Sequence, residues 1–263
     1  MCLMEKLKTV SYSQYSVWHN CPKQWKLQYV DNLKPDESSI ELIFGTAMHE
    51  VIQDWLKKYF EDQKKAKIID LGVPLKEKLK TYIVEESKEM PDGSRVFVCD
   101  KETLQEYYDD GCKILDHLQK YAQDFFPTKG YRLLGCEVPL EFDLVENVAF
   151  RGYLDIVVYD EKKDEYHIVD LKTSRAGWFY QKQDPKKINQ VLLYKHFYAF
   201  KYNVDPEKIY PRFIILKRKI TENKDFLVRR LSKFEPSHGK IAMNRATTSW
   251  QQFLKECFTP EGE

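Results

Sequence analysis

The sequence predicts an α/β fold in which a mixed central sheet is flanked by helices and preceded by a mainly helical N-terminal region. Helical apolar spacing dominates up to about residue 126, and extended β-branched and aromatic segments begin near residue 133. Helix and strand patterns then alternate to the end. The 263 residues, with 14% aromatic content and 17 tyrosines, are enough for one domain with a substantial core and an insertion.

The first half of the chain is expected to be helical. Residues 11–30 form a helix that is interrupted near Cys21 and Pro22, and residues 44–60 form a second helix with one apolar stripe. Residues 61–98 are charged and punctuated by glycine and proline, which favours an insertion or a helical cap. Residues 102–126 form a long amphipathic helix that ends at a proline.

Strands are expected next. Residues 133–145 alternate between apolar and polar side chains, and residues 151–159 and 166–172 are rich in Val, Ile, Leu and Tyr. The polar stretch 160–165 between the last two segments predicts a β-hairpin.

The rest of the chain alternates helix and strand. A helix is expected to begin at Asp184-Pro185 and to reach about residue 202, followed by a buried strand at 209–217, an edge strand at 226–234 and a helix at 237–258. We therefore expect a single domain over residues 1–263, with three parts: a mainly helical part at 1–130, a sheet core at 131–234 and a C-terminal helix at 235–263.

The hairpin carries the clearest chemical signal. If its turn is centred on Lys162-Lys163, facing positions sum to 325 and Asp155 lies opposite Asp170. Facing like charges are destabilising and need a cation. Lys172 follows Asp170 by two and shares its face. Hard carboxylate oxygens favour Mg²⁺ or Mn²⁺, so the hairpin predicts a metal site of the kind that phosphodiester cleavage requires, although either aspartate alone also fits a solvated strand end.

Four further residues are weaker candidates. His49, at the start of a helix, fits either a core or surface position or a metal ligand; position 53 is Gln, so no zinc-protease motif is present. Glu137 fits a solvated strand position or the catalytic face. Gln190 and Tyr194 share one helix face, where they form either a surface pair or a contact to DNA or water.

Several basic and aromatic residues follow the hairpin. The cations are Arg175, Lys182, Lys186, Lys187, Lys217, Arg218, Lys219, Arg229 and Arg230. They fit either solvated faces or contacts to phosphate groups. Trp178, beside Phe179 and Tyr180, fits either a packed loop anchor or a surface that stacks unpaired bases.

Composition excludes some classes. The net charge of +1 argues against a generally basic nucleic-acid coat protein. The sequence has no phosphate loop of the Walker type, which argues against an NTPase, and no apolar run long enough for a membrane span. An N-terminal signal peptide is not expected, and the six cysteines are scattered, so we predict a cytoplasmic protein without a disulfide framework.

Five short motifs occur in order along the chain: Ser11-Tyr-Ser13 with Cys21-Pro22 and Tyr29, Gly45-x-x-x-His49, Gly152-x-x-Asp155, Asp170-Leu171-Lys172 and Gln190-x-x-x-Tyr194. Together they resemble the RecB-like branch of the PD-(D/E)XK nuclease superfamily. The resemblance extends from about Ser11 to Tyr202.

The resemblance implies a restriction-endonuclease-like core and a site for one or two Mg²⁺ or Mn²⁺ ions. His49, Asp155, Asp170 and the Leu171 carbonyl would bind metal, with Glu137 as a further acidic position. Lys172 would orient the attacking water and stabilise charge, and Gln190 and Tyr194 would contact substrate.

Some members of this branch hold an iron–sulfur cluster on one upstream and three C-terminal cysteines. Here Cys21 matches the upstream position, but the C-terminal region has only Cys257, so no cluster is predicted.

The resemblance favours a DNA exonuclease that acts on ends or single strands in repair, recombination or phage DNA metabolism, in a prokaryotic or phage setting. Its partners would be DNA and a helicase, a recombinase or a single-strand-binding protein. An endonuclease on the same core and a non-catalytic DNA-binding or scaffold subunit are the alternatives. The intact Asp155, Asp170 and Lys172 argue against the non-catalytic form.

Overall fold

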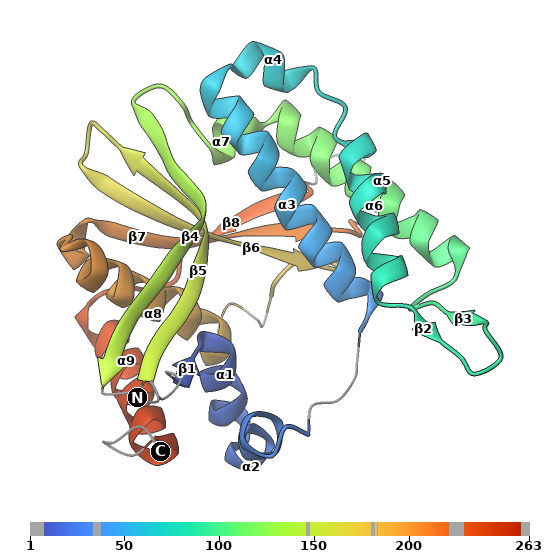
Figure 1. Ribbon diagram of the computed structural model, residues 1–263. Coiled ribbons are helices and arrows are strands. Elements are labelled where there is room, and N and C mark those ends of the chain that lie inside the picture. Colours follow the sequence, from blue (N-terminus) through green and yellow to red (C-terminus); the bar gives the residue numbers. More distant parts are fainter. Residues whose placement is uncertain are drawn as a thin grey trace, which may run out of the picture.

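A six-stranded mixed sheet lies at the centre of the protein (Figure 1). The computed structural model describes residues 8–33, 38–145, 148–179, 182, 184–220 and 229–258. The strands of the sheet are β1 (Lys8–Val10), β4 (Tyr131–Val145), β5 (Val148–Asp160), β6 (Glu165–Ser174), β7 (Ile209–Lys217) and β8 (Leu231–Phe234).

The strands run in the order β1-β5-β6-β7-β8, and β4 pairs with β5. Pairing is antiparallel within β4–β5, β5–β6 and β7–β8, and parallel within β1–β5 and β6–β7. The parallel β6–β7 pair needs a crossover, and helix α8 supplies it.

Helices cover both faces of the sheet. The helices are α1 (Tyr12–Asn20), α2 (Pro22–Trp25), α3 (Ile40–Glu61), α4 (Gln63–Lys67), α5 (Gly72–Glu85), α6 (Lys101–Lys120), α7 (Ala122–Phe125), α8 (Pro185–Tyr202) and α9 (Lys240–Cys257). A π-helical turn follows α2 at Lys26–Val30, and a 3₁₀ turn at Pro206–Lys208 follows α8.

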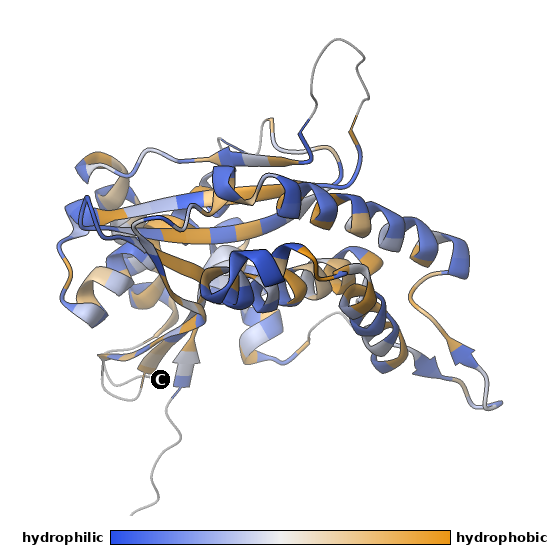
Figure 2. Cartoon of the chain, turned by 90° about the horizontal axis from the view of Figure 1, so that it is seen from above, coloured by the Kyte–Doolittle hydropathy of each residue, from blue (hydrophilic) through white to orange (hydrophobic). Residues whose placement is uncertain are grey.

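The two helical layers bury separate cores. Helices α3, α5 and α6 pack with one sheet face, and α1, α8 and α9 pack with the other. Figure 1 shows α3, α5 and α6 side by side, with the short hairpin of β2 (Lys88–Glu89) and β3 (Arg95–Val96) projecting beyond them. In Figure 2 the sheet is largely hydrophobic and the helices carry hydrophilic stretches. In the described part of the chain, no helix is both long and apolar enough to cross a membrane.

Most predicted elements are confirmed, and the α/β class with them. The helix expected at 11–30 is interrupted at Cys21, which terminates α1 and precedes Pro22. The strand expected at 209–217 has the bounds of β7. Residues 61–98, expected to be an insertion or a helical cap, contain α4, α5 and the β2–β3 hairpin. The division of the chain into three parts within a single domain stays a prediction.

Three expectations need correction. The helix expected at 102–126 is divided at Tyr121, where α6 ends and α7 begins. The edge strand begins at Leu231, and residues 226–228 lie outside the described ranges. Strand β1 was not expected, because a three-residue strand carries too little periodicity to be recognised.

At Glu137 on β4 and Asp155 on β5, the side chains that point into one core switch to the other core. On β5, Leu154 packs into the α8 and α9 core, whereas Ile156, two residues on, packs into the α3 core. Residues two apart on a regular strand share one face, so the strand must twist or bulge here. Glu137 lies at the same level of β4 with a φ of 51°, which a regular strand does not allow.

One edge of β5 has a notch. Strand β1 pairs with residues 148–150, and β6 pairs with residues 156–160. Among the described residues, no strand is paired with that edge between them. Residues 151–155 therefore line an opening in the sheet, and Asp155 lies at its inner end.

Candidate active site

The hairpin has the predicted register, but its ladder ends one pair early. Positions that sum to 325 face each other in five pairs, from Asp160 with Glu165 to Ile156 with Val169. Asp155 and Asp170 would be the sixth pair. The prediction that they form a regular cross-strand pair is wrong, because β5 and β6 diverge there. The two carboxylates lie at the mouth of the resulting fork.

Asp155 is held at this fork by β6. Its Oδ2 accepts a hydrogen bond from the backbone N–H of Leu171 at 2.8 Å. The Nδ1 atom of His49 approaches the same oxygen to 3.5 Å from helix α3. The side chain of Asp155 is 17% exposed and that of His49 is 24% exposed, so the pair lies just below the surface.

Asp170 and Lys172 share one face of β6, as predicted. The Nζ of Lys172 lies 2.8 Å from Oδ2 of Asp170, whose side chain is only 4% exposed. Although this ion pair is short, Oδ2 has no hydrogen-bond partner of acceptable geometry. Lys172 is thus the one cation beside Oδ2 among the described residues, and a buried carboxylate group with so few partners is a natural position for a second cation.

Both carboxyl groups ionise at a higher pH than an ordinary aspartate. Burial raises the pKa of Asp155 to about 6, against the opposing charge of Lys172. Burial also raises the pKa of Asp170 to about 6, and the charge of Asp155 adds to this effect. A single lysine does not offset the loss of hydration of two acids, so a further positive charge would stabilise both anions.

His49 and Lys172 have the protonation states that a metal site needs. Burial lowers the pKa of His49 despite the nearby Asp170, which keeps its imidazole neutral and able to bind a metal. Burial lowers the pKa of Lys172, but the charges of Asp170 and Asp155 raise it by a larger amount, so the net shift is upward. In the metal-free protein Lys172 is therefore an ammonium ion.

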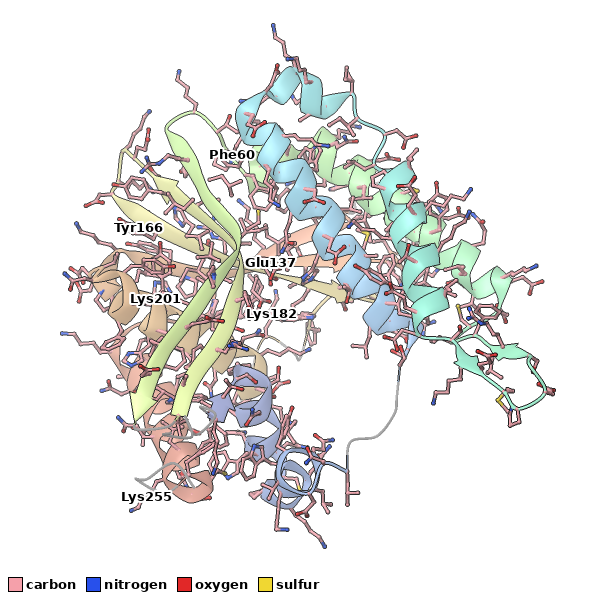
Figure 3. The ribbon with its side chains drawn as sticks, viewed as in Figure 1. Phe60, Glu137, Tyr166, Lys182, Lys201 and Lys255 are labelled. Atoms are coloured by element: carbon pink, nitrogen blue, oxygen red, sulfur yellow. The ribbon has the colours of Figure 1, made fainter. Side chains whose placement is uncertain are left out.

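Glu137 and Gln53 complete the side of the site next to β4. Gln53 Nε2 donates to Glu137 Oε1 at 2.6 Å and to the backbone carbonyl of Asp155 at 3.2 Å. Glu137 lies on β4 at the level of Asp155 on β5, near the middle of the sheet (Figure 3). Gln53 was not a candidate from sequence, yet it lies four residues after His49 on α3, and that spacing places both on one helix face.

The opposite side of the fork is aromatic. Gln190 Nε2 lies 3.4 Å from Tyr194 Oη, a long hydrogen bond between the two predicted substrate residues. The ring of Tyr194 meets that of Tyr12 edge to face at 6.1 Å, and Tyr12 donates to the backbone carbonyl of Lys186. Burial raises the pKa of both phenols, so both stay protonated.

Gly152 makes room for the ring of Phe150, next to Tyr194. A Cβ atom at this position would lie 3.0 Å from the ring of Phe150 and 3.5 Å from Cε1 of Tyr194. The glycine of the Gly152-x-x-Asp155 motif therefore has a packing reason that the sequence alone does not show.

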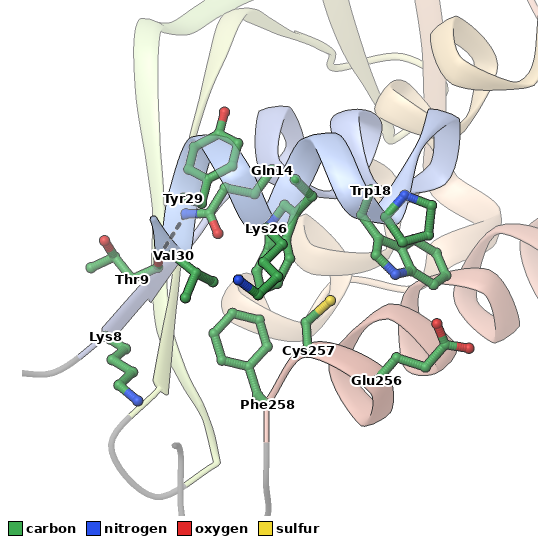
Figure 4. A pocket seen from close by; sticks show the side chains of 12 residues that line it. Lys8, Thr9, Gln14, Trp18, Lys26, Tyr29, Val30, Glu256, Cys257 and Phe258 are labelled. Carbon is green, nitrogen blue, oxygen red and sulfur yellow. Dashed lines mark hydrogen bonds between the residues drawn. The ribbon is translucent and has the colours of Figure 1, made fainter. Parts of the chain in front are cut away.

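A pocket of about 370 Å³ lies along the notch. It is lined by β5 residues, by the β1–α1 segment and by Tyr194, namely residues 9–14, 151–153 and 194. A larger pocket of about 670 Å³ lies between α1, α2, β1 and the end of α9 (Figure 4). Its lining contains none of the candidate catalytic residues, so we place the chemistry at the fork and not in the larger cavity.

A second cluster of possible metal ligands lies at the turn end of the hairpin. Asp160, Glu165 and His167 present ligand atoms within 4.8 Å of one another. These groups are already engaged. Arg212 Nη2 lies 2.9 Å from His167 Nδ1, and Asp160 Oδ1 accepts hydrogen bonds from the backbone of the turn. The guanidinium places a positive charge where a metal would bind, so the fork fits a cation better.

Trp178 and Arg175 lie in the loop after β6. The ring of Trp178 packs against Phe213 and Phe234 at centroid distances of 4.9 and 6.4 Å. This packing matches the loop-anchor alternative. The side chain of Arg175 is exposed. A contact of either residue to substrate stays a prediction.

The fold and the fork define a class of protein. A mixed sheet between helical layers, with two buried acids and a lysine on diverging strands, is the architecture of a metal-dependent α/β nuclease core.

Comparison with known proteins gives the family. The family model described as the PD-(D/E)XK nuclease superfamily matches residues 9–256. This chain belongs to that superfamily. Among solved structures, the chain is similar in fold to a putative exonuclease from Eubacterium rectale, with a TM-score of 0.54 and 12% identity over 97% of this chain and 85% of the other. No curated protein sequence matches the chain significantly.

Proposed function

We propose that this nuclease is a metal-dependent DNA exonuclease of the RecB-like branch, in which Asp155, Asp170 and Lys172 are the catalytic residues. The observation that carries the proposal is the fork, where two buried carboxylates, each with its pKa raised by burial, meet a single ammonium group. The name of the Eubacterium rectale protein supports the exonuclease form.

His49, Asp155, Asp170 and the Leu171 carbonyl would hold Mg²⁺ or Mn²⁺, with Glu137 as a further ligand. Carboxylate oxygens and one neutral imidazole suit these hard cations. When bound, such an ion supplies the positive charge that polarises a phosphodiester and acidifies water. The chain contributes the geometry: Leu171 and His49 orient Asp155, and Gln53 holds Glu137.

Lys172 would act on the substrate as a fixed cation. Its ammonium group is kept in place by Asp170 and lies on the face of β6 that Tyr194 also approaches. A positive charge positioned there stabilises the extra negative charge that a phosphate gains as water attacks. Because the pKa of Lys172 is raised, orientation and charge stabilisation are the roles that this geometry supports, and proton abstraction is not.

Substrate contacts would come from Gln190, Tyr194, Arg175 and Trp178. The first two lie on the face of α8 beside the fork, and the notch next to Tyr194 offers a concave path for a strand end. DNA ends or single strands would be the substrate, during repair, recombination or phage DNA metabolism. A helicase, recombinase or single-strand-binding protein would be the partner, in the cytoplasm.

The test is a comparison of linear and closed circular DNA, each incubated with Mg²⁺ or Mn²⁺. We expect shortening of end-labelled linear strands and no nicking of the circle. The shortening should be lost in Asp170→Asn and in Lys172→Ala, with either metal. Nicking of the circle would replace the exonuclease by an endonuclease on the same core. Metal-independent DNA binding without any cleavage would contradict the catalytic proposal.

A further inference from the structure

Apart from Arg175, which is exposed in the loop after β6, the basic residues that follow the hairpin fall into two groups in the structure. Five of the nine are engaged within the protein. Lys186 donates to Asn20 at 2.6 Å, and Arg229 pairs with Asp124 at 3.1 Å. Arg230 donates to the backbone carbonyl of Arg218 at 2.6 Å. These cations hold the fold together.

Arg218 and Lys219 belong to the same group. Arg218 lies 3.1 Å from Asp110, and Lys219 lies 2.7 Å from Glu106 and 3.0 Å from Asp110. The guanidinium of Arg218 also lies over the ring of Tyr107 at 3.6 Å. These contacts fasten α6 to the end of β7, and their charges are neutralised locally.

Lys182, Lys187 and Lys217 are different. In the described ranges, no carboxylate forms an ion pair with any of the three. Lys187 Nζ lies 4.5 Å from the centre of the Trp178 ring, and Lys182 Nζ lies 5.6 Å from the centre of the Phe234 ring. Trp178, Phe234 and Phe213 form one small core, so this core is a platform that positions two of the ammonium groups.

Lys217 is positioned by the loop itself. Its stem passes Gly177, where an added Cβ would lie 3.1 Å from Lys217 Cδ. Gly177 has a φ of 98°, and its backbone N–H and carbonyl both bond Oγ of Ser174 at 3.1 Å. The turn therefore needs glycine at this position, both for the backbone conformation and for the lysine stem.

The three lysines are continuous with the catalytic face. In the β6–β7 ladder, Asp170 is paired with Phe213, Lys172 with Ile215 and Ser174 with Lys217. Positions two apart share a face, so Lys217 follows Lys172 on the same face, one two-residue step of ~6.6 Å further along the sheet.

The pKa values of Lys187 and Lys217 respond to other lysines nearby. Burial and then the charge of Lys172 lower the pKa of Lys187, against the charge of Asp184. Burial and then the charge of Lys182 lower the pKa of Lys217. The carboxylate of Asp184 is itself occupied, since it accepts a hydrogen bond from the backbone of Lys186 at the start of α8. Lys182 and Lys217 are neighbouring positive charges without an ion-pair partner among the described residues, so they repel each other, and an anionic ligand would relieve the repulsion.

We propose that Lys187, Lys182 and Lys217 form a phosphate-binding row that guides one DNA strand away from the catalytic fork. The proposal rests on the proposed nuclease function and adds the path of the substrate. Figure 3 shows Lys182 in the region below Glu137. Trp178 packs against Phe213, and the ammonium group of Lys187 lies over its ring. This surface would therefore contact phosphate groups of DNA and not bases. Binding along the row is independent of sequence.

The experiment measures how DNA binding depends on salt. Single-stranded oligonucleotides are titrated with the Asp170→Asn protein, in which cleavage is suppressed, and with the same protein carrying Lys182→Gln, Lys187→Gln and Lys217→Gln. Glutamine keeps much of the aliphatic stem on the rings and removes only the charge. The slope of log K against log salt is expected to become shallower by about 2, since each phosphate contact on a single strand contributes about 0.7.

The matched control removes three exposed lysines from α4 and α5: Lys64→Gln, Lys67→Gln and Lys80→Gln. This variant has the same net charge change and should keep the original slope. The proposal of a phosphate-binding row would be overturned if the row variant had the same slope as its Asp170→Asn parent. It would also be overturned if the control variant lost as much slope as the row variant.

A kinetic readout separates the row from the nuclease proposal. With Asp170 intact, the row variant should raise the KM for DNA at least about tenfold near physiological salt and leave kcat within about twofold, because the row binds substrate without touching the reacting atoms. If the unmodified protein cleaves nothing, the nuclease proposal fails and the slope still decides on the row. If it cleaves and the KM is unchanged, the row alone fails.

Discussion

The backbone N–H of Leu171 donates to Oδ2 of Asp155 at 2.8 Å, across the point where β5 and β6 separate. The residue between Asp170 and Lys172 thus fixes the carboxylate on the facing strand. The ladder ends at Ile156 and Val169, so this single bond takes over from the pairing that would otherwise continue. The Asp-x-Lys motif and the distant aspartate are one structural unit.

Asp170→Asn should separate metal binding from folding. It removes one of two buried like charges, so the metal-free variant should be at least as stable as the unmodified protein. Cleavage should fall by at least about 10³-fold, equivalent to about 4 kcal/mol. When the Mn²⁺ concentration is 100 times its dissociation constant, the free energy of unfolding of the unmodified protein should rise by about 2.7 kcal/mol. That of the variant should rise little. Denaturant unfolding with and without Mn²⁺ measures both effects, and an undiminished metal response would contradict the site.

The metal response should depend on pH. In the metal-free folded protein, the pKa of each carboxyl group is raised to about 6, above its ordinary value near 3.8. The folded state therefore binds more protons than the unfolded state between about pH 4 and 6, and this contribution to stability is lost as pH rises through 6.

Metal binding requires the ionised carboxylates, so stabilisation by Mg²⁺ should be small at pH 5 and large at pH 7.5. Thermal unfolding across this range provides the measurement, with Asp170→Asn as the control whose response is flatter. A metal response of the same size at both pH values would be inconsistent with ligands whose pKa is near 6.

Asp160→Asn tests the competing cluster. Asp160, Glu165 and His167 have a suitable spacing for a metal, but Arg212 and the turn backbone already engage them. We expect this variant to lose some stability at the turn and to keep both cleavage and its stabilisation by Mn²⁺. Loss of the Mn²⁺ response in Asp160→Asn, with retention in Asp170→Asn, would move the metal to the turn end of the hairpin.

Gly152→Ala should disturb the packing of Phe150 and, through it, the surroundings of Tyr194. The added methyl group would lie 3.0 Å from the ring of Phe150, so one of the neighbouring rings must move. Overpacking of this kind costs about 1–3 kcal/mol of folding free energy. Because Tyr194 lies beside the fork, the KM for DNA should also rise. Ser249→Ala on α9, which removes the acceptor of a hydrogen bond from Tyr15, serves as a control that should leave the KM unchanged.

Gln53→Leu tests the support of Glu137. The substitution removes the donor to Glu137 and to the carbonyl of Asp155 while keeping the approximate volume of the side chain. We expect cleavage to fall about 10- to 100-fold, the size seen when groups that orient metal ligands are removed, with a weaker response to Mn²⁺. Gln53→Glu would place a carboxylate against Glu137 and should be worse. Unchanged cleavage in both variants would show that Glu137 needs no support from α3.

Local rules account for the parts that could be predicted. The hairpin register follows from one short turn, because each residue of the turn constrains the next, and the pairs from Asp160 to Ile156 follow from it. Lys172 lies beside Asp170 for the same reason, since strand side chains alternate with a period of two. Gln53 could have been found by extending the helical spacing from His49 by one turn.

Other parts depend on residues far apart in the chain. The notch beside Asp155 exists because β1, near the N-terminus, pairs with residues 148–150 and stops. The face change at Glu137 reflects two helical layers that compete for the same strands. No local pattern reports either feature, because long-range packing decides where a sheet divides.

The sequence by itself determined which acids and which lysine could meet, on which hairpin and in which register. Only the tertiary structure decided that the ladder opens before Asp155 and Asp170 pair, and that Lys182, Lys187 and Lys217 stay without ion-pair partners among the described residues while their neighbours are neutralised. The physical reason is the distance along the chain over which each interaction acts. Periodicity and turn geometry act over a few residues, whereas burial, charge pairing and the divergence of strands depend on segments that only folding brings together.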